Sequence, residues 1–440
     1  MSSSPPEGAV PAAPRVRVWI DATRPQSGLV VFGMSLVERH LRGLVQAGIA
    51  AEEIRIELPA AASPEASVAS HALVPATFAA TLPIRWSHEG GPPRERLERA
   101  LADAHGALVL ALDGDAIVDA RLLAHLEKRG AALVATDPTP ECGAPTAVLS
   151  LAAPLGVAIK GERLVEIAAS AVEQGALARL SVAELDTYLQ RLRRSLPPYL
   201  FVVRDAADRD AAERFLFWSN YKGSTDFFTR YVYPPLVWRA LRPLTRWRVH
   251  PNVITLFNVV ITLAAVPLFA KGWWVSGFAC AWGMSVLDSV DGKLARLQFK
   301  SSELGHNLDH GLDLIHPPLW YFAWAYALSG GDLGSPLFHA SIWMAAFYAG
   351  DRIVTRLFTW RTGRSIHAFT PLDVRMRTVI SRRNINLPLF TIGLPLGLGR
   401  ETFALIVAWQ IATFAFHALR LAQCWNRREA RGTGGAAQDD

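Results

Sequence analysis

The chain changes character near residue 220, and this change constrains the fold more than any other feature of the sequence. Residues 1–200 carry 19 Lys and Arg against 22 Asp and Glu, whereas residues 201–440 carry 26 against 17. In the second part Trp, Phe, Leu, Ile and Val become dense, and the charges collect between apolar runs. An acidic first part and a basic, apolar second part predict a soluble domain joined to a membrane domain.

The composition excludes several classes of protein. Charged residues make up 19% of the chain, below the roughly one quarter that is typical of soluble proteins, and hydrophobic residues make up 51%. Such a chain is neither globally disordered nor a coiled coil. Its three cysteines are scattered without metal-ligand spacing, which excludes a disulfide scaffold and a zinc ribbon. We expect no nucleic-acid partner.

Six apolar segments follow residue 250 and predict an all-α membrane domain of six transmembrane helices. Several are shorter than the roughly 20 residues that an ideal span needs, and the fifth is the weakest. A short, buried or tilted span accounts for such a segment. The segments are 253–270, 273–287, 308–328, 336–350, 387–398 and 403–421.

The charges between these segments predict the orientation of the membrane domain. The loop over 351–385 contains eight arginines, whereas the loops on the opposite side carry only Lys271 and Arg400. The positive-inside rule then places both termini and the basic loops in the cytoplasm. Residues 222–250 mix aromatic residues with arginines and are interrupted by Pro234-Pro235. They predict an amphipathic segment on an anionic membrane surface, with a solvated connector as the alternative.

Residues 15–202 alternate short apolar runs with helical patterns. The runs 16–20, 54–58, 107–112 and 132–135 are predicted strands, and 33–47 is a predicted helix closed by Gly48. Strands that alternate with helices indicate an α/β domain with a mostly parallel sheet. The predicted organisation is a disordered tail (1–14), the α/β domain (15–202), a connector with the juxtamembrane segment (203–250), the membrane domain (251–425) and a second disordered tail (426–440).

Four carboxylates lie at helical spacing beside the second and third apolar segments. Asp288 and Asp291 share one helix face, and Asp309 and Asp313 share a face of the next helix. Antiparallel neighbours joined by a short loop bring all four together. Four anions in a low-dielectric site need a counter-charge, most naturally Mg²⁺ or Mn²⁺, since these hard ions prefer oxygen ligands. Two ions bridged by carboxylates form a clamp for displacement at phosphorus.

The alternative is that these are ordinary interfacial carboxylates, although ionisable residues within spans are rare and usually functional. The small residues around them favour a binding site. Gly292 leaves room for a ligand to approach the backbone, Ala295 is small on the same side, and Gly305 keeps the facing helix clear. Arg296 offers a planar fork that suits phosphate.

The complete pattern, Asp288-x2-Asp291-Gly292-x2-Ala295-Arg296-x8-Gly305-x3-Asp309-x3-Asp313, resembles the signature of the CDP-alcohol phosphatidyltransferase family at every signature position. The resemblance covers about residues 220–425 and includes Pro251-Asn252-x2-Thr255 at the start of the first span. It implies transfer of a substituted phosphate from a CDP-linked donor to a hydroxyl acceptor, with release of CMP and no covalent enzyme intermediate.

The resemblance also implies a role for each signature residue. Two divalent ions, Mg²⁺ or Mn²⁺, would be bound by Asp288, Asp291, Asp309 and Asp313. The CDP site would be shaped by Gly292, Ala295, Arg296 and Gly305 together with the first aspartates. Asp313 would take the proton from the acceptor hydroxyl. Such ions neutralise a diphosphate and stabilise the leaving CMP.

The substrates stay open at this point. The donor is CDP-diacylglycerol or a CDP-polyol, and the acceptor is an alcohol or a polyol phosphate, in phospholipid or polyol-phosphate synthesis. Homodimers are common in the resembled family. Some of its members hold an acceptor phosphate in an arginine pocket, for which the candidates are Lys300, Arg361, Arg364, Arg375, Arg377, Arg382 and Arg383. Positive-inside anchoring explains more than half of these residues. Nearby, His310, His316 and His367 are interpreted as structural or interfacial histidines.

The first domain resembles sugar-phosphate nucleotidyltransferases in two places. Residues 32–41 resemble the start of their first helix, and residues 111–115 resemble their metal-binding strand end. However, residues 20–28 lack the repeated glycines that let a backbone wrap a triphosphate, and the usual lysine before the helix is missing. A degenerate, inactive domain is therefore predicted. Asp113 and Asp115 are candidate metal ligands, with a strand-end turn as the plainer interpretation.

Two other functions compete with the transferase. A membrane prenyltransferase also uses Asp-rich motifs and Mg²⁺ on diphosphates, but its motifs usually lie on two distant helix pairs. A membrane-anchored nucleotide-binding protein without turnover is the non-catalytic alternative. The single compact cluster disfavours the first, and the intact aspartate set disfavours the second.

Overall fold

The structure, a computed structural model, describes residues 15–60, 73–155, 161–189 and 192–426. The chain divides into two compact units. The first is Met1–Tyr188 with Ser195–Ser219, and the second is Leu189–Arg194 with Asn220–Asp440. The predicted disordered tails, 1–14 and 426–440, lie outside the described residues except for Asn426, the last residue of the final helix.

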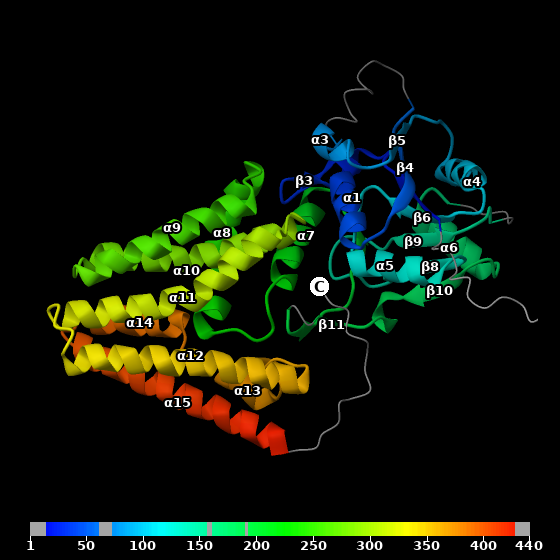
Figure 1. The fold of residues 1–440 in the computed structure, drawn as a ribbon. Helices are drawn as coiled ribbons and strands as arrows, with labels where there is room; N and C mark the ends of the chain where they lie inside the picture. Colours follow the sequence, from blue (N-terminus) through cyan, green and yellow to red (C-terminus); the bar gives the residue numbers. More distant parts are fainter. Residues whose placement is uncertain (1–14, 61–72, 156–160, 190–191, 427–440) are drawn as a thin grey trace, which may run out of the picture. The chain divides into compact units, whose positions relative to one another are not determined.

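A seven-stranded sheet forms the centre of the first unit, in the order β10-β8-β9-β6-β1-β4-β5 (Figure 1). Neighbouring strands are parallel except at β9, which is antiparallel to both β6 and β8. The prediction of an α/β domain with a mostly parallel sheet is confirmed. The strands are β1 (Val16–Asp21), β4 (Ala51–Glu57), β5 (Ile84–Ser87), β6 (Leu108–Asp113), β8 (Leu133–Thr136), β9 (Ala147–Leu151) and β10 (Ala178–Ser181).

Alternation along the strands gives this sheet two cores. Val18 and Ile20 of β1 belong to a core with α1 (Leu36–Gln46) and α5 (Ala120–Arg129). Trp19, between them, belongs to a second core with α4 (Pro93–Asp103) and α6 (Leu164–Glu173). Side chains of period two thus bury both faces, as expected for a sheet covered by helices on each side.

The predicted helix over 33–47 begins later than expected. Phe32 and Gly33 have positive φ and form the turn between β2 (Val30–Val31) and β3 (Met34–Ser35). Helix α1 then starts at Leu36, where the Ser35 hydroxyl accepts a hydrogen bond from the Glu38 amide. The remaining elements of this part of the chain are η1 (Pro25–Gly28), α3 (Ala76–Ala79), β7 (Ala116–Val118), η2 (Val182–Glu184), β11 (Tyr188–Leu189), β12 (Arg194–Ser195), β13 (Leu200–Val202) and α7 (Ala206–Ser219).

The second unit is helical, and each predicted apolar segment overlaps a helix, but the fifth, 387–398, continues five residues beyond the end of its helix at Gly393. The six helices are α9 (Pro251–Ala270), α10 (Trp274–Leu297), α11 (Glu303–Leu328), α12 (Pro336–Thr362), α14 (Arg383–Gly393) and α15 (Gly399–Asn426). Helix α9 packs on α10 and α11, and α12 packs on α11 and α15 (Figure 1). Shorter elements are η3 (Phe228–Val232), α8 (Tyr233–Arg246), η4 (Ile366–Ala368) and α13 (Pro371–Met376).

Two sequence interpretations of this unit are wrong in detail. The basic loop predicted over 351–385 is partly helical, because α12 continues past its apolar portion and ends at Gly363, whose φ of 68° makes it a left-handed cap. Pro234 and Pro235 do not interrupt a helix. They lie in the first turn of α8, where a missing backbone N–H costs nothing.

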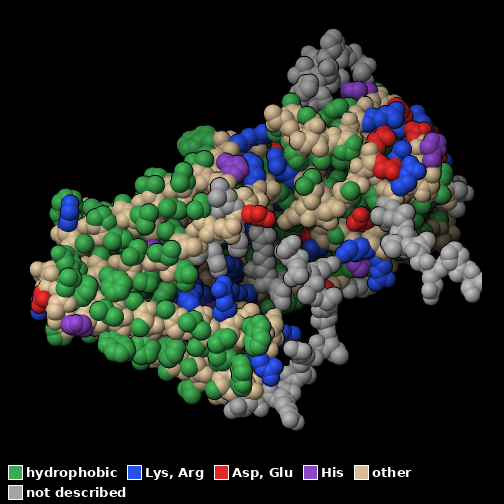
Figure 2. Space-filling model, viewed as in Figure 1, with side chains coloured by type: hydrophobic (Ala, Val, Ile, Leu, Met, Phe, Trp, Pro, Cys, Tyr) green, Lys and Arg blue, Asp and Glu red, His purple; other side chains and the backbone are tan. Residues whose placement is uncertain are grey.

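The surface of the helical unit is strongly apolar (Figure 2). Within the described residues, two helices, α9 and α15, are long and apolar enough to cross a membrane. Helix α9 exposes a continuous stripe, with Leu256 61% exposed and Val260 56% exposed. Helices α11, α12 and α14 also expose large apolar side chains, including Ile315, Trp343 and Ile392. Water is a poor solvent for such a surface.

Candidate active site

A single guanidinium joins two of the predicted carboxylates in the helical unit. Arg383, the first residue of α14, donates from Nη2 to Asp288 Oδ2 at 2.9 Å and from Nη1 to Asp313 Oδ1 at 3.0 Å. Asp288 lies on α10 and Asp313 on α11, so the two helices direct their acids to one point. The Arg383 side chain is only 10% exposed. The sequence predicted the convergence of these carboxylates but not the cation between them.

Asp291, one turn after Asp288 on α10, is held by α9 and not by Arg383. Its Oδ2 accepts a hydrogen bond from the Thr255 hydroxyl at 2.9 Å, and its side chain is almost fully buried. Asn252, from the same predicted start of the first span, accepts from Ser302 Oγ at 2.8 Å. A Cβ at Gly305 would lie 3.0 Å from the Asn252 side-chain oxygen. The α9 start is thus in contact with both halves of the signature.

The remaining signature residues lie on α10 and α11. A Cβ at Gly292 would lie 3.3 Å from the Arg296 guanidinium, so the glycine leaves room for that side chain. Ala295 and Arg296 lie on the following turn of α10. Asp309 lies on α11 one turn before Asp313, and its side chain is outside the described part of the structure.

A divalent ion such as Mg²⁺ needs several oxygen ligands directed to one point. Within the described side chains, no group of three or more His, Cys, Asp and Glu residues has the geometry of a metal site. Asp288 and Asp313 nevertheless converge on one positive charge, and all their free ligands are oxygen atoms. This donor set suits Mg²⁺ or Mn²⁺ rather than a softer metal.

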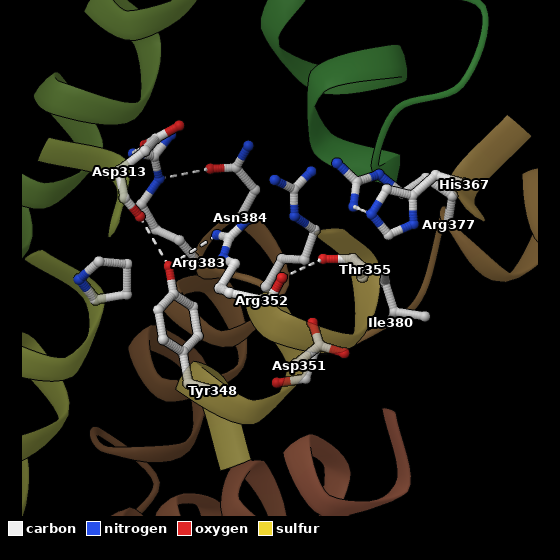
Figure 3. A pocket seen from close by; sticks show the side chains of 13 residues that line it. Asp313, Tyr348, Asp351, Arg352, Thr355, His367, Arg377, Ile380, Arg383 and Asn384 are labelled. Carbon is white, nitrogen blue, oxygen red and sulfur yellow. Dashed lines mark hydrogen bonds and ion pairs between the residues drawn. The ribbon is translucent and has the colours of Figure 1, made fainter. Parts of the chain in front are cut away.

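A basic pocket adjoins Asp313 (Figure 3). Three of the seven predicted cations, Arg377, Arg382 and Arg383, line it, whereas Lys300, Arg361, Arg364 and Arg375 are not among its lining residues. Arg352 also lines it and was assigned by sequence to a loop. The helical position of Arg352, four residues after Tyr348, is the signal that would have placed it, because both residues share one face of α12.

Tyr348 connects this pocket to Asp313. Its hydroxyl donates to the Asp313 carbonyl oxygen at 2.7 Å and accepts from Arg352 Nη2 at 2.7 Å (Figure 3). Tyr348 therefore links the Arg352 guanidinium to the backbone of Asp313, and Arg352 also lines the pocket.

The histidines near the site hold other groups in place. His316 Nδ1 is bonded to the Leu312 carbonyl at 2.7 Å, and its Nε2 lies 3.3 Å from Arg383 Nη1. His367 Nε2 accepts from Arg377 Nη1 at 3.0 Å, and burial together with the Arg377 charge lowers the pKa of His367. Both act as neutral acceptors toward arginine, as the structural interpretation of these residues predicts. The His310 side chain is outside the described residues.

The first unit has a separate acidic cluster at the carboxyl edge of its sheet. Asp21 and Asp113 end the parallel neighbours β1 and β6 in register, and both are buried together with Asp115. Each carboxylate has an arginine: Arg96 on Asp21 at 3.0 Å, Arg24 on Asp113 at 3.2 Å and Arg163 on Asp115 at 3.1 Å. Burial and the Asp115 charge raise the pKa of Asp113 to about 6.

Comparison with known proteins identifies relatives of the helical unit. Residues 248–419 match the CDP-alcohol phosphatidyltransferase family. The chain is 30% identical over 146 residues to the bifunctional IPC transferase and DIPP synthase of Thermococcus kodakarensis, covering 28% of this chain and 32% of that protein. It is 30% identical over 113 residues to the inner membrane protein YnjF of Escherichia coli, covering 24% of this chain and 54% of that protein. The chain thus spans about a third and about half of these relatives.

Solved structures similar to each part of the chain are more distant. One is the phosphatidylinositol phosphate synthase PgsA1 of Mycobacterium tuberculosis with CDP-DAG bound, at 18% identity and a TM-score of 0.35, covering 47% of this chain and 99% of that one. Another is a 4-diphosphocytidyl-2C-methyl-D-erythritol synthase, at 14% identity and a TM-score of 0.32, covering 46% of this chain and 99% of that one.

Proposed function

We propose, from the match of residues 248–419 to the CDP-alcohol phosphatidyltransferase family, that this chain is an integral membrane CDP-alcohol phosphotransferase. It would transfer a substituted phosphate from a CDP-linked donor to a hydroxyl acceptor and release CMP. The observation that carries the proposal is the convergence of Asp288 and Asp313, from two helices, on one cation beside an arginine-lined pocket.

Two divalent ions, Mg²⁺ or Mn²⁺, would be held by Asp288, Asp291, Asp309 and Asp313. When bound, the ions would neutralise the donor diphosphate and the charge of the leaving CMP. Thr255 would orient the Asp291 carboxylate by its hydrogen bond to Oδ2. Arg383 holds Asp288 and Asp313 at one point and so keeps two mutually repelling acids in position.

Different residues of the chain would bind the donor and take the proton of the acceptor. The donor would lie along α10 beside the half-buried Gly292, Ala295 and Arg296, and Gly305 of α11, which lies against Asn252 of α9, would border the same site. The acceptor oxygen would form a bond to the transferred phosphorus while the bond to the CMP oxygen breaks. Asp313, whose side chain is 40% exposed, would take the acceptor's proton.

The basic pocket suits an acceptor that carries its own phosphate. Arg352, Arg377 and Arg382 provide planar forks beside Asp313, and such forks bind phosphate through paired hydrogen bonds. A polyol phosphate fits this chemistry better than an uncharged lipid alcohol. The donor would be CDP-diacylglycerol or a CDP-polyol. A homodimer is a further element of the proposal.

The membrane arrangement would consist of six spans with both termini and the active site in the cytoplasm. The exposed apolar side chains on α11, α12 and α14 support spans beyond the two most apolar helices. The many arginines at the site end of the bundle support the cytoplasmic orientation.

The first unit would not transfer nucleotides. Asp21, Asp113 and Asp115 are each neutralised by a buried or half-buried arginine, which leaves no surplus negative charge for a metal–triphosphate complex. We accordingly expect no diphosphate release from CTP with any polyol phosphate.

The test is CMP release by the purified protein with Mg²⁺ or Mn²⁺. CDP-diacylglycerol and CDP-polyols serve as donors, and polyol phosphates and lipid extract as acceptors. We expect metal-dependent release that falls at least 100-fold in Asp313→Asn, since a general base typically contributes 10²–10⁴-fold. The matched control is Asp332→Asn, in the loop after α11, where the carboxylate accepts a hydrogen bond from the Gly334 amide.

Three results would contradict the proposal. Full activity in Asp313→Asn excludes the assigned base. Tight CDP binding without release favours the nucleotide-binding protein. Release of diphosphate from an allylic diphosphate, with no CMP from any CDP-linked donor, favours the prenyltransferase.

A further inference from the structure

Residues 221–226, which we term the strap, lie in the chain before the family match and yet belong to the helical unit. One end of the strap is fixed to the signature helix, because the Tyr221 ring lies 3.3 Å from Lys293 Nζ of α10. The other end is fixed beside the basic pocket. The Ser224 hydroxyl donates to the His367 carbonyl at 2.5 Å, and Asp226 accepts from Asn384 Nδ2 at 3.2 Å.

Residues 192–194, which also lie outside the family match, are hydrogen-bonded to the strap. The Gly223 amide donates to the Leu192 carbonyl at 2.9 Å, and Arg194 Nη1 donates to the Tyr221 carbonyl at 3.4 Å. The two backbones approach so closely that a Cβ at Gly223 would lie 2.6 Å from the Arg193 carbonyl oxygen. The strap therefore follows a defined path between the donor side and the acceptor pocket.

Lys222 is the residue that this path presents to the site. It lies between Tyr221, which is anchored to α10, and Gly223, which is anchored to residues 192–194. The residue as a whole is exposed, and across the described part of the chain no hydrogen bond or ion pair involves its ammonium group. The protein atoms around the ammonium group remove part of its hydration, and this loss, together with the charges of Arg296, Arg193 and Arg382, lowers the pKa of Lys222 to about 8, while the Asp288 charge acts in the opposite direction.

These neighbours come from both halves of the proposed reaction. Asp288 and Arg296 belong to the signature on α10, and Arg382 lines the basic pocket. Because more cations than anions act on the Lys222 ammonium group, its positive charge is unfavourable there, and a bound anion would relieve the repulsion. The anion that both halves of the site would share is phosphate.

We propose that Lys222, held by the strap, binds a substrate phosphate at the junction of the donor surface and the basic pocket. This inference rests on the proposed function for the identity of the substrates. It adds a specificity residue from the chain outside the family domain. The phosphate comes either from the CDP-linked donor or from the acceptor, and the experiment separates these sources.

The experiment measures binding and turnover in Lys222→Gln, with Lys271→Gln as the matched control. Lys271 lies at the far end of α9, and its Nζ is 5.0 Å from the Trp273 ring centroid. Binding of CDP in the presence of Mn²⁺ reports the donor side, and binding of inorganic phosphate reports the acceptor side. We expect at least one of the two to weaken about 10-fold, the KM of the matching substrate to rise similarly and Lys222→Arg to restore most of the loss.

Gly223→Ala tests the path of the strap independently, because the added Cβ forces the strap away from Arg193. We expect the same ligand to bind less tightly in this variant. Unchanged binding of both CDP and phosphate in Lys222→Gln would overturn the inference. Because neither probe requires turnover, this result is distinct from an absence of CMP release by the wild-type protein, which would contradict the proposed function instead.

Discussion

Replacing Arg383 with Met tests whether this arginine takes the place of a metal ion in the site. The guanidinium forms an ion pair with both Asp288 and Asp313, whose side chains are 21% and 40% exposed. Removing one partner of a fully buried ion pair costs about 3–5 kcal/mol, and the exposure of the two acids reduces this to about 2–3 kcal/mol. For a unit of this size, such a loss lowers Tm by roughly 5–10 °C in the absence of metal.

The expected result depends on metal. With saturating Mn²⁺ the ion supplies the missing charge, so the loss of Tm in Arg383→Met should shrink to less than half of its value in EDTA. The assay is thermal unfolding of the purified protein in detergent under both conditions. The control is Arg364→Met, which removes an exposed arginine from the same basic region. An equal loss of Tm with EDTA and with Mn²⁺ would refute the reasoning, since it would show that the ion does not take over the role of Arg383.

Two further predictions concern stability. Gly277→Ala places a Cβ 2.5 Å from the buried Phe269 ring and should destabilise the α9–α10 contact by about 1–3 kcal/mol, whereas Gly283→Ala, with its nearest neighbour at 3.7 Å, should change Tm little. Burial lowers the pKa of His40 to about 4, so the folded state loses stability as the pH falls from about 6.5 to 4. The raised pKa of Asp113 has the opposite effect, because protonation of this buried acid stabilises the folded state over nearly the same pH range. His40→Gln removes only the first effect, so between about pH 7 and 4 the variant should gain about 3 kcal/mol relative to wild type, measured by hydrogen exchange of the β6 amides in the full chain. A stability difference that is independent of pH would contradict this assignment.

The elements that the sequence predicted well have a strong local signal. The apolar runs of β1, β4, β6 and β8 are visible in the residues themselves. Strand β9 was not predicted. It is antiparallel between two strands of an otherwise parallel order, and its pairing depends on chain segments far away. The end of α12 was misplaced because apolar character stops at Gly350, whereas the backbone signal, Gly363, comes later.

The sequence predicted only those features of the site that follow from the spacing of residues along one helix. Spacing places Asp288 with Asp291 and Asp309 with Asp313, and of these acids Asp288 and Asp313 meet at Arg383. It carries no information about Arg383, which is 70 residues beyond Asp313 in a region rich in arginine. The arginines of that region look alike in sequence, and only the fold separates those that line the pocket from those that anchor the membrane face.

The two acidic clusters of this chain differ in how many arginines accompany their aspartates, and this difference bears on whether each could bind a metal ion. In the first unit three acids are matched by three arginines, so the cluster is already neutral and an added divalent ion would have to displace a buried ion pair. In the helical unit Asp288 and Asp313 share one arginine, and Asp291 is held by an uncharged hydroxyl. On the proposed function, the second cluster retains negative charge on its acids, so a divalent ion would lower its energy, whereas it would raise that of the first. The balance of charge around the carboxylates, more than their spacing, therefore distinguishes a metal site from a structural cluster.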